Sequence, residues 1–261
     1  MNCLIETALL THGLRSIANE ELAQSWHCPD AILAWVDGGE LKLGPIGEYL
    51  PFRERSEELI RIDCDHLEEA LQTGASGALT ASGTMAVCRR LDIPMAITCG
   101  MGGIGDLRGE ELCPDLPALM NIPVALISTS PKDMLDRPAT LDWLRRHGVH
   151  TAGEPCTGYL FCGESVALEL PLSSCNNEAA VRRLTANGGL LLLNPIPEKE
   201  RVQDRSILVD AIKAGKQAEA EGHYYHPAAN GEIDRRTGGY SSRIQLESIQ
   251  QNYLLAKSIM D

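Results

Sequence analysis

The stretch Val124-Ala125-Leu126-Ile127-Ser128-Thr129-Ser130-Pro131-Lys132 shows the pattern on which the fold prediction rests. It begins with an apolar run of the length of a buried strand, and a polar loop follows at once. Residues 141–147 then have helical periodicity and end at Gly148, a residue type common just after helices. This order predicts a strand, a loop and a helix that returns along the sheet.

The same order recurs along the chain. Short apolar runs predict strands at residues 3–10, 31–35, 40–43, 59–62, 94–98 and 190–193. Helical periodicity predicts helices at residues 65–71, 80–91, 206–221 and 242–260. Val36-Asp37-Gly38-Gly39 reads as a hairpin turn between two of the strands. Residues 222–241 are polar and contain glycine, so we expect an ordered surface loop there.

This alternation predicts an α/β fold. Strands separated by helices need crossover connections, which give a mixed, largely parallel central sheet sandwiched between helices. No linker, repeat or break in composition divides the chain, so we expect a single domain over residues 1–261. Ligands bind beyond the carboxyl ends of strands in such folds. That rule points to the loops at residues 99–109, 128–133 and 194–198.

Composition limits the classes of function. The 261 residues are 44% hydrophobic and 23% charged, which excludes a disordered chain, and no apolar run reaches the roughly 20 residues of a membrane span. A net charge of −13 disfavours general binding to nucleic acid or anionic membranes. The N-terminus lacks the features of a signal peptide, and the nine cysteines form no C-x-x-C pair. We therefore expect a cytoplasmic protein with reduced thiols and a small-molecule partner.

Two residues are candidates for chemistry. Lys132 directly follows a strand and loop at the expected ligand face, where partial burial would lower its pKa and make the amine a nucleophile. Glu6 lies within the first apolar run, where burial would raise its pKa into the range of a general acid. The alternatives are a loop lysine that caps a helix, and a glutamate that faces solvent or pairs with an arginine.

A glycine-rich loop follows the strand at residues 94–98. Gly100-Met101-Gly102-Gly103-Ile104-Gly105 formally matches a dinucleotide-binding pattern, but the residues after it are broken by glycine and proline. Its N–H groups, together with Arg108, are suited to hold one anionic group. The alternative is a tight turn.

Acidic and histidine residues offer weaker signals. An acidic cluster, suited to a divalent cation or to solvent, comprises Glu110, Glu111 and Asp115. His223 and His226 have no third ligand at a zinc-like spacing, so we expect no metal there. His12 follows the first strand and is expected to border the ligand face or to make a structural hydrogen bond.

Several motifs resemble the pseudouridine-5′-phosphate glycosidase family, also called the indigoidine-synthase-A-like family. The most specific is Asn187-Gly188-Gly189-Leu190-Leu191-Leu192-Leu193-Asn194-Pro195-Ile196-Pro197-Glu198, which is similar to the family's NGG-apolar-NPIPE signature. Further similar segments lie at residues 6–13, 74–85, 102–109, 114–136 and 237–239. The resemblance spans nearly the whole chain.

The resemblance implies cleavage of the C–C glycosidic bond of pseudouridine 5′-phosphate to uracil and ribose 5-phosphate. It places a Schiff-base lysine at Lys132 and a proton-transferring glutamate at Glu6. It implies substrate contacts from the other motif residues, Asp115, Asn194, Gly102, Gly103, Arg108 and Thr84. It further implies a divalent metal, commonly Mn²⁺, for which Glu111 is the nearest ligand, and a homotrimer.

The sequence also departs from the family. Ala75 stands where the family has a substrate-contacting lysine, Leu107 replaces a histidine, and the family's metal-binding aspartate is missing. Two alternatives therefore stay open beside a C-nucleoside or pentose phosphate as ligand. One is a Schiff-base enzyme acting on a non-phosphorylated or different sugar. The other is a non-catalytic homologue that has lost the metal and phosphate site.

Overall fold

The apolar run at residues 124–128 forms β8 near the middle of a large sheet. The structure, a computed structural model, describes residues 1–105, 113–186, 188–223 and 225–260. Within these residues the sheet has ten strands in the order β11-β10-β12-β8-β6-β1-β2-β5-β4, with β3 paired to β2. The strands are β1 (Cys3–Ile5), β2 (Leu33–Asp37), β3 (Glu40–Gly44), β4 (Ile60–Ile62), β5 (Gly77–Leu79), β6 (Met95–Ile97), β8 (Ala125–Ser128), β10 (His150–Gly153), β11 (Leu170–Pro171) and β12 (Leu190–Leu193).

Most neighbouring strands run parallel. The antiparallel pairs within the described residues are β2 with β3 and β2 with β5. The turn between β2 and β3 is the expected hairpin, in which Gly38 and Gly39 have φ angles of 59° and 77° that favour glycine. The predicted class, a mixed and largely parallel sheet between helices, is confirmed.

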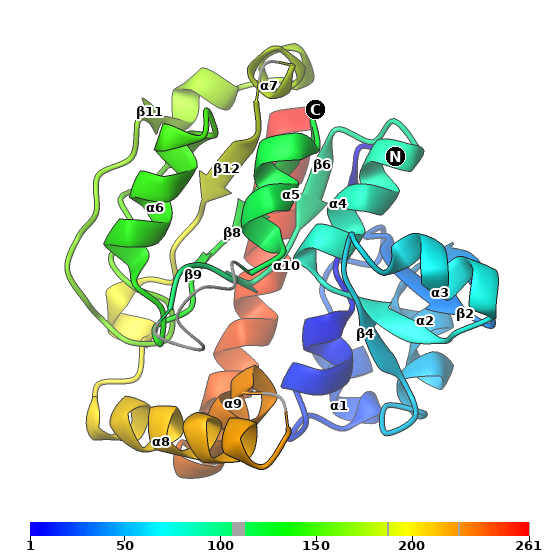
Figure 1. Cartoon of the computed structure of the whole chain (residues 1–261), viewed down its shortest axis with the longest axis vertical. Helices are drawn as coiled ribbons and strands as arrows, with labels where there is room; N and C mark the ends of the chain where they lie inside the picture. The colour runs from blue at the N-terminus through cyan, green and yellow to red at the C-terminus, as the bar shows by residue number, and fades with distance from the viewer. Residues whose placement is uncertain (106–112, 187, 224, 261) are drawn as a thin grey trace.

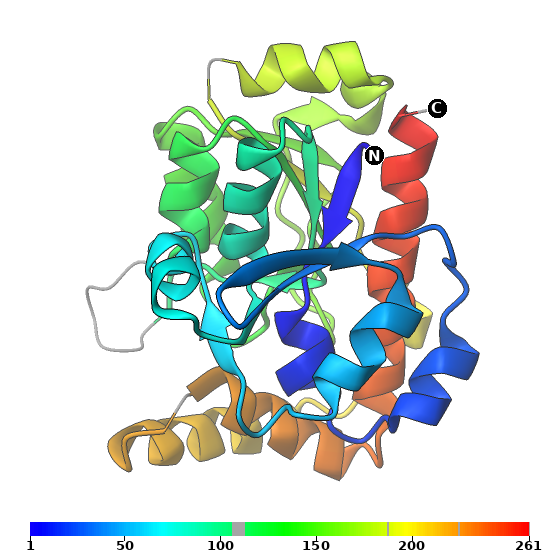
Figure 2. The same ribbon diagram turned by 90° about the vertical axis from the view of Figure 1, so that its right-hand side faces the viewer.

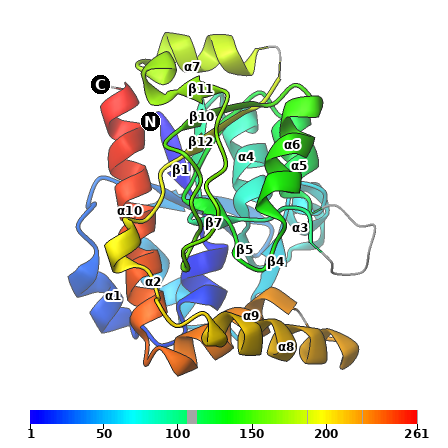
Figure 3. The ribbon, with the colours of Figure 1, turned by 90° about the vertical axis from the view of Figure 1, so that its left-hand side faces the viewer.

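Helices cover both faces of the sheet, and Figures 2 and 3 show α10 on one side and α4, α5 and α6 on the other. Both chain ends lie at the same end of the molecule (Figure 1). The helices are α1 (Asn19–Ser25), α2 (Ile46–Arg53), α3 (Leu67–Thr73), α4 (Ala81–Arg90), α5 (Asp115–Asn121), α6 (Arg137–Arg146), α7 (Glu178–Thr185), α8 (Ser206–Ala220), α9 (Tyr225–Arg236) and α10 (Tyr240–Met260). None of those described is long and apolar enough to cross a membrane.

Alternate residues of the central strands supply the two cores. In β12, Leu190 and Leu192 join the apolar cluster on the α10 face, whereas Leu191 and Leu193 join the cluster on the α4 face. Because successive side chains of a strand point to opposite faces, a strand buried on both sides reads as a continuous apolar run. This explains why four consecutive leucines form a strand here.

The first strand is shorter than predicted. The sequence prediction of a strand over residues 3–10 is wrong beyond Ile5, because the chain leaves the sheet and forms the π-helical turn η1 (Leu9–Gly13). The Thr7 hydroxyl donates to the Ala34 carbonyl and accepts from the Leu79 N–H. These side-chain bonds replace strand pairing, so the chain can turn although its residues are apolar.

The prediction of a surface loop at residues 222–241 is also wrong, since the helix α9 occupies most of that segment. Pro227 lies in the first turn, where a helix tolerates proline because the missing N–H has no intrahelical partner. Tyr225, Ala229 and Ile233 recur at helical spacing and are buried in the core. The polar composition of the segment hid this short apolar stripe.

Close backbone approaches explain the paired glycines before β12. A Cβ atom on Gly189 would lie 1.7 Å from the Leu119 carbonyl oxygen, and one on Gly188 would lie 2.2 Å from the Gly148 carbonyl oxygen. Both contacts are at the amino end of β12, the end opposite to the expected ligand face. These glycines therefore serve packing between β12 and its neighbours.

We predict that Gly189→Ala lowers the free energy of unfolding by at least about 2 kcal/mol, because backbone must move to admit the methyl group. Gly47→Ala in α2 is the matched control, since a Cβ there meets nothing within 4 Å, and it should be neutral or stabilise by up to about 1 kcal/mol. Urea denaturation measures both. Equal stability of the two variants would contradict this packing role.

Candidate active site

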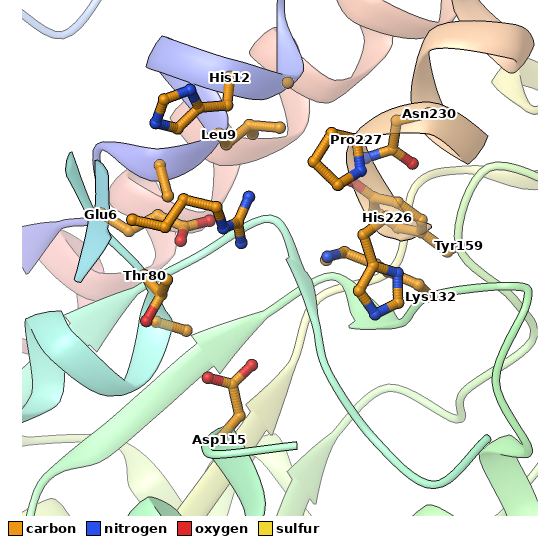
Figure 4. Close-up of a pocket in the computed structure, with 15 residues that line it drawn as sticks. Glu6, Leu9, His12, Thr80, Asp115, Lys132, Tyr159, His226, Pro227 and Asn230 are labelled. Carbon is orange, nitrogen blue, oxygen red and sulfur yellow. The ribbon is translucent and has the colours of Figure 1, made fainter. Parts of the chain in front are cut away.

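A hollow lies where the chain leaves the carboxyl ends of β1, β6 and β8 and meets α9 (Figure 4). It has two parts that share five lining residues, Arg61, Thr80, Asp115, Lys132 and His226. The inner part, here called the recess, has a volume of about 40 Å³, and the outer cavity has a volume of about 550 Å³. The outer volume is typical of pockets that bind small molecules.

Glu6 is held at the inner side of the recess. It directly follows β1, is 6% exposed, and its carboxylate accepts a 2.6 Å hydrogen bond from the Thr98 hydroxyl. Burial raises the pKa of Glu6 to about 7, and the Thr98 hydrogen bond and the Lys132 charge only partly oppose this. The carboxyl group can therefore exchange a proton near neutral pH.

Lys132 reaches the same recess from the other side. A separate two-stranded parallel sheet, β7 (Gly100–Met101) and β9 (Ser130–Pro131), ends at this lysine, whose backbone N–H donates to the Met101 carbonyl. Figure 4 shows the amine pointing into the recess. Burial, followed by the Arg61 charge, lowers the pKa of Lys132. Both effects favour the neutral, nucleophilic amine.

Asp133 fixes the loop that carries Lys132. Its carboxylate accepts hydrogen bonds from the backbone N–H groups of residues 159, 160 and 161, at 2.9, 2.7 and 3.0 Å, and pairs with Arg137 at 3.1 Å. These bonds bring Tyr159 to the recess, where its hydroxyl donates to Gln245 at 2.8 Å. One carboxylate thus joins the lysine loop to a second wall of the site.

Asp115 lines both parts of the hollow, at the start of α5. Its two carboxylate oxygens accept from the backbone N–H groups of Ser82 at 3.1 Å and Gly102 at 2.8 Å. A Cβ on Gly102 would lie 2.0 Å from the Cys113 sulfur, so the close approach requires glycine. The glycine-rich loop is therefore held to α4 and α5 through Asp115.

A buried arginine holds η1, which carries His12 to the recess. The Arg53 guanidinium donates to the carbonyl oxygens of Leu10, Leu14 and Ile17. His12 lines the recess as the sequence suggested. Burial, with the charges of Arg61 and Arg15, lowers the pKa of His12 to about 4, so its ring is neutral at pH 7.

Other expected site residues lie elsewhere. Asn194 lines a separate cavity and donates to Asn252 at 3.0 Å. Thr84 is buried in α4, where its hydroxyl donates to the Thr80 carbonyl, and Gly103 lies against Thr140. Arg108 and Glu111 lie outside the described residues. Of the three expected loops, those at residues 99–109 and 128–133 contribute described residues to the hollow.

Four residues that line this site were not expected there from the sequence: Arg61, Tyr159, His226 and Asn230. Arg61 lies in β4, and among the described residues its guanidinium has no ion pair or hydrogen bond. An arginine flanked by two isoleucines in a short strand is the one sequence signal that could have indicated it. His226 and Asn230 depend on α9, which was read as a loop.

The donors for a metal ion are incomplete in the described part of the chain. It contains no group of three or more histidine, cysteine, aspartate or glutamate side chains placed to hold a metal. Both oxygens of Asp115 already accept backbone hydrogen bonds. The prediction of a manganese site therefore depends on Glu111, which lies outside the described residues.

The chain matches the model of one known protein family. The family model described as "Indigoidine synthase A like protein" matches residues 4–260. The pseudouridine-5′-phosphate glycosidase of Methylobacterium nodulans is 28% identical, covering 98% of this chain and 81% of the relative. That of Escherichia coli is 27% identical, covering 98% and 88%.

Two solved structures share the fold. The prealnumycin C-glycosynthase AlnA, solved in complex with ribulose 5-phosphate, matches with a TM-score of 0.75 and 23% identity, covering 98% of this chain and 91% of that one. An indigoidine synthase A-like protein from Thermotoga maritima matches with a TM-score of 0.77 and 19% identity, with the same coverage.

We predict a pH-dependent stability change for Glu6→Gln. A carboxyl whose pKa rises from 4.5 to about 7 on folding binds more protons when folded, so the free energy of unfolding falls as pH rises through that window. Glutamine removes this loss. The variant should gain about 3 kcal/mol over the wild type between pH 4 and pH 8.

Urea denaturation at a series of pH values measures this difference. Glu57→Gln, at an exposed position, is the control and should follow the wild type at every pH. If both variants follow it, Glu6 does not titrate as described.

Proposed function

Because the chain belongs to the family of indigoidine synthase A like proteins, we propose that it makes or breaks a carbon–carbon glycosidic bond to a pentose. Relatives named as pseudouridine-5′-phosphate glycosidases support this reaction class. The observation that carries the proposal is that the Lys132 amine and the Glu6 carboxyl line one recess. Burial favours the neutral form of each, as a nucleophile and an acid require.

In the direction of cleavage, the neutral amine of Lys132 attacks C1′ of a C-nucleoside. The new C–N bond forms as the bond from C1′ to the ring oxygen breaks, which opens the sugar. A proton passes from the new ammonium to that oxygen, which becomes the hydroxyl on C4′ and leaves the nitrogen with a lone pair. The nitrogen lone pair then forms an iminium while the C1′–base bond breaks, and its electron pair moves to the base carbon. Glu6 donates a proton to that carbon. Water hydrolyses the iminium, which releases the pentose as an aldehyde, restores the neutral amine and returns one proton to Glu6.

A carbon leaving group explains why both residues are needed. Protonation of an oxygen or nitrogen cannot assist its departure, so the iminium supplies the electron sink and the acid supplies the proton. The same steps in reverse join a pentose to a carbon nucleophile. A homologue without activity would have no reason to keep a partly buried amine and a buried carboxyl in one recess at a cost in stability.

The substrate in this proposal is phosphorylated. Arg61 lines both the recess and the outer cavity and has no counter-ion among the described side chains. In a protein of net charge −13, such a guanidinium offers a local site for an anion. It can take the place of the lysine that Ala75 replaces, because Ala75 lines the same outer cavity. A pentose 5-phosphate fits both the amine and the guanidinium.

We predict that borohydride reduction in the presence of ribose 5-phosphate adds the sugar covalently to Lys132. Lys132→Ala should lose this adduct and lower turnover of pseudouridine 5′-phosphate by about 10³-fold or more, with an unchanged circular dichroism spectrum. Peptide mass mapping locates the adduct. Lys199→Ala, at an exposed lysine, is the control and should label like the wild type. A wild type that binds the sugar by calorimetry but leaves Lys132 unmodified would refute the mechanism.

We predict that Arg61→Ala weakens binding of ribose 5-phosphate about 10- to 100-fold, the loss of a charge-assisted hydrogen bond. Its affinity for ribose should change less than about threefold. Calorimetric titration with both sugars measures this, and Arg89→Ala, an exposed arginine in α4, is the control. An equal loss of affinity for ribose 5-phosphate and for ribose would favour the alternative of a non-phosphorylated substrate.

A further inference from the structure

Three buried polar atoms without a hydrogen-bond partner among the described residues line the recess. They are His12 Nε2, His226 Nδ1 and Asn230 Oδ1. An unsatisfied buried polar group costs about 1–3 kcal/mol, and folded proteins contain few of them. Three in one recess are a set of groups that a ligand would satisfy.

The size of the recess limits what these atoms can meet. Its volume of about 40 Å³ has room for roughly three groups of the size of a water molecule. A sugar carbon chain or a base requires the adjoining outer cavity, which is more than ten times larger. Single hydroxyl groups that project from such a ligand fit the recess.

The charges around the recess exclude a cation as the occupant. Burial and the Lys132 charge lower the pKa of His226 well below its ordinary value, so its ring, like that of His12, is neutral at pH 7. The Arg61 guanidinium borders the same space and would repel a metal ion, and both carboxylate oxygens of Asp115 already accept backbone hydrogen bonds. Neutral imidazoles and an amide, which both donate and accept, are matched to hydroxyl groups.

The helix α9 brings two of the three atoms into place. His226 and Asn230 are four residues apart, so they lie on one face of the helix. Together α8 and α9 lie across the carboxyl end of the sheet (Figure 1). Ala229 and Ile233 anchor α9 in the core, and Asn230 is 9% exposed. The face of α9 that carries His226 and Asn230 is here called the α9 roof.

We propose that the α9 roof reads the hydroxyl groups of the pentose, with His226 bonded to the hydroxyl on C2 and Asn230 to one further along the sugar. His226 lies beside Lys132 (Figure 4), and C2 is the neighbour of the carbon that Lys132 attacks. Asn230 lies one helical turn along α9 from His226. This assignment rests on the proposed function, because it takes the position of C1 from the Lys132 adduct.

The test compares ribose 5-phosphate with 2-deoxyribose 5-phosphate, which lacks only the hydroxyl on C2. The wild type should bind the ribose compound at least about tenfold more tightly, because the deoxy sugar leaves His226 unsatisfied. His226→Ala should lose this preference mainly by weaker binding of ribose 5-phosphate. Asn230→Leu should lower the affinity for both sugars by the same factor and so keep the preference for ribose 5-phosphate.

Two further variants separate recognition from folding. His226→Asn keeps a polar atom at the δ position and should retain part of the preference that alanine loses. Arg235→Gln lies on the exposed side of α9 and should behave as the wild type. Thermal melting confirms that each variant folds.

Calorimetry and borohydride trapping are run in parallel on the full chain. Equal affinity of the wild type for both sugars overturns the role of the α9 roof, whether or not Lys132 is labelled. Binding with the expected preference but without an adduct at Lys132 upholds recognition of C2 and refutes the Schiff base. If neither sugar binds, both proposals fail.

Discussion

The site depends on one constraint: Glu6, which is buried, and Lys132, which is partly buried, share one recess. Among the described residues no ion pair joins them, so neither charge is fully compensated, and each pKa moves toward the neutral form. Water would reverse both shifts by solvating the charges. The elements around the recess keep it small and largely closed: η1 on one side, the Tyr159 loop on another and α9 across the end. The proposed chemistry therefore depends on the enclosure as much as on the two residues.

Single polar side chains that bind backbone groups hold this enclosure together. Asp133 links the lysine loop to residues 159–161 by hydrogen bonds, and Asp115 links the glycine-rich loop to α4 in the same way. Arg53 donates hydrogen bonds to the carbonyl groups around η1. Irregular segments cannot satisfy their own N–H and C=O groups, so a buried charged side chain does this for them. Each of these three side chains fixes a wall of the site through backbone groups, and Asp115 also lines the hollow itself.

The motifs that carry the family resemblance have different physical roles. Gly188 and Gly189 allow close packing at the amino end of β12, far along the strand from the recess. Arg201, just after the NPIPE segment, donates to the Ile196 carbonyl and so shapes the chain that leaves β12. The most specific signature in the sequence therefore reports the fold, whereas the residues suited to chemistry lie in shorter and weaker motifs.

The sequence by itself determined what depends on local pattern. Apolar runs located seven strands of the central sheet but not β5, β10 and β11, the Asp37-Gly38-Gly39 turn set the hairpin, and helical periodicity located α4. The sequence also predicted Lys132, which follows a strand, at the ligand end of the sheet, and singled out Glu6 within the first apolar run. Only the tertiary structure placed Arg61, His226 and Asn230 beside them. Their contacts join segments up to 224 residues apart, counted from Glu6 to Asn230, and burial and unsatisfied hydrogen bonds exist only once those segments meet.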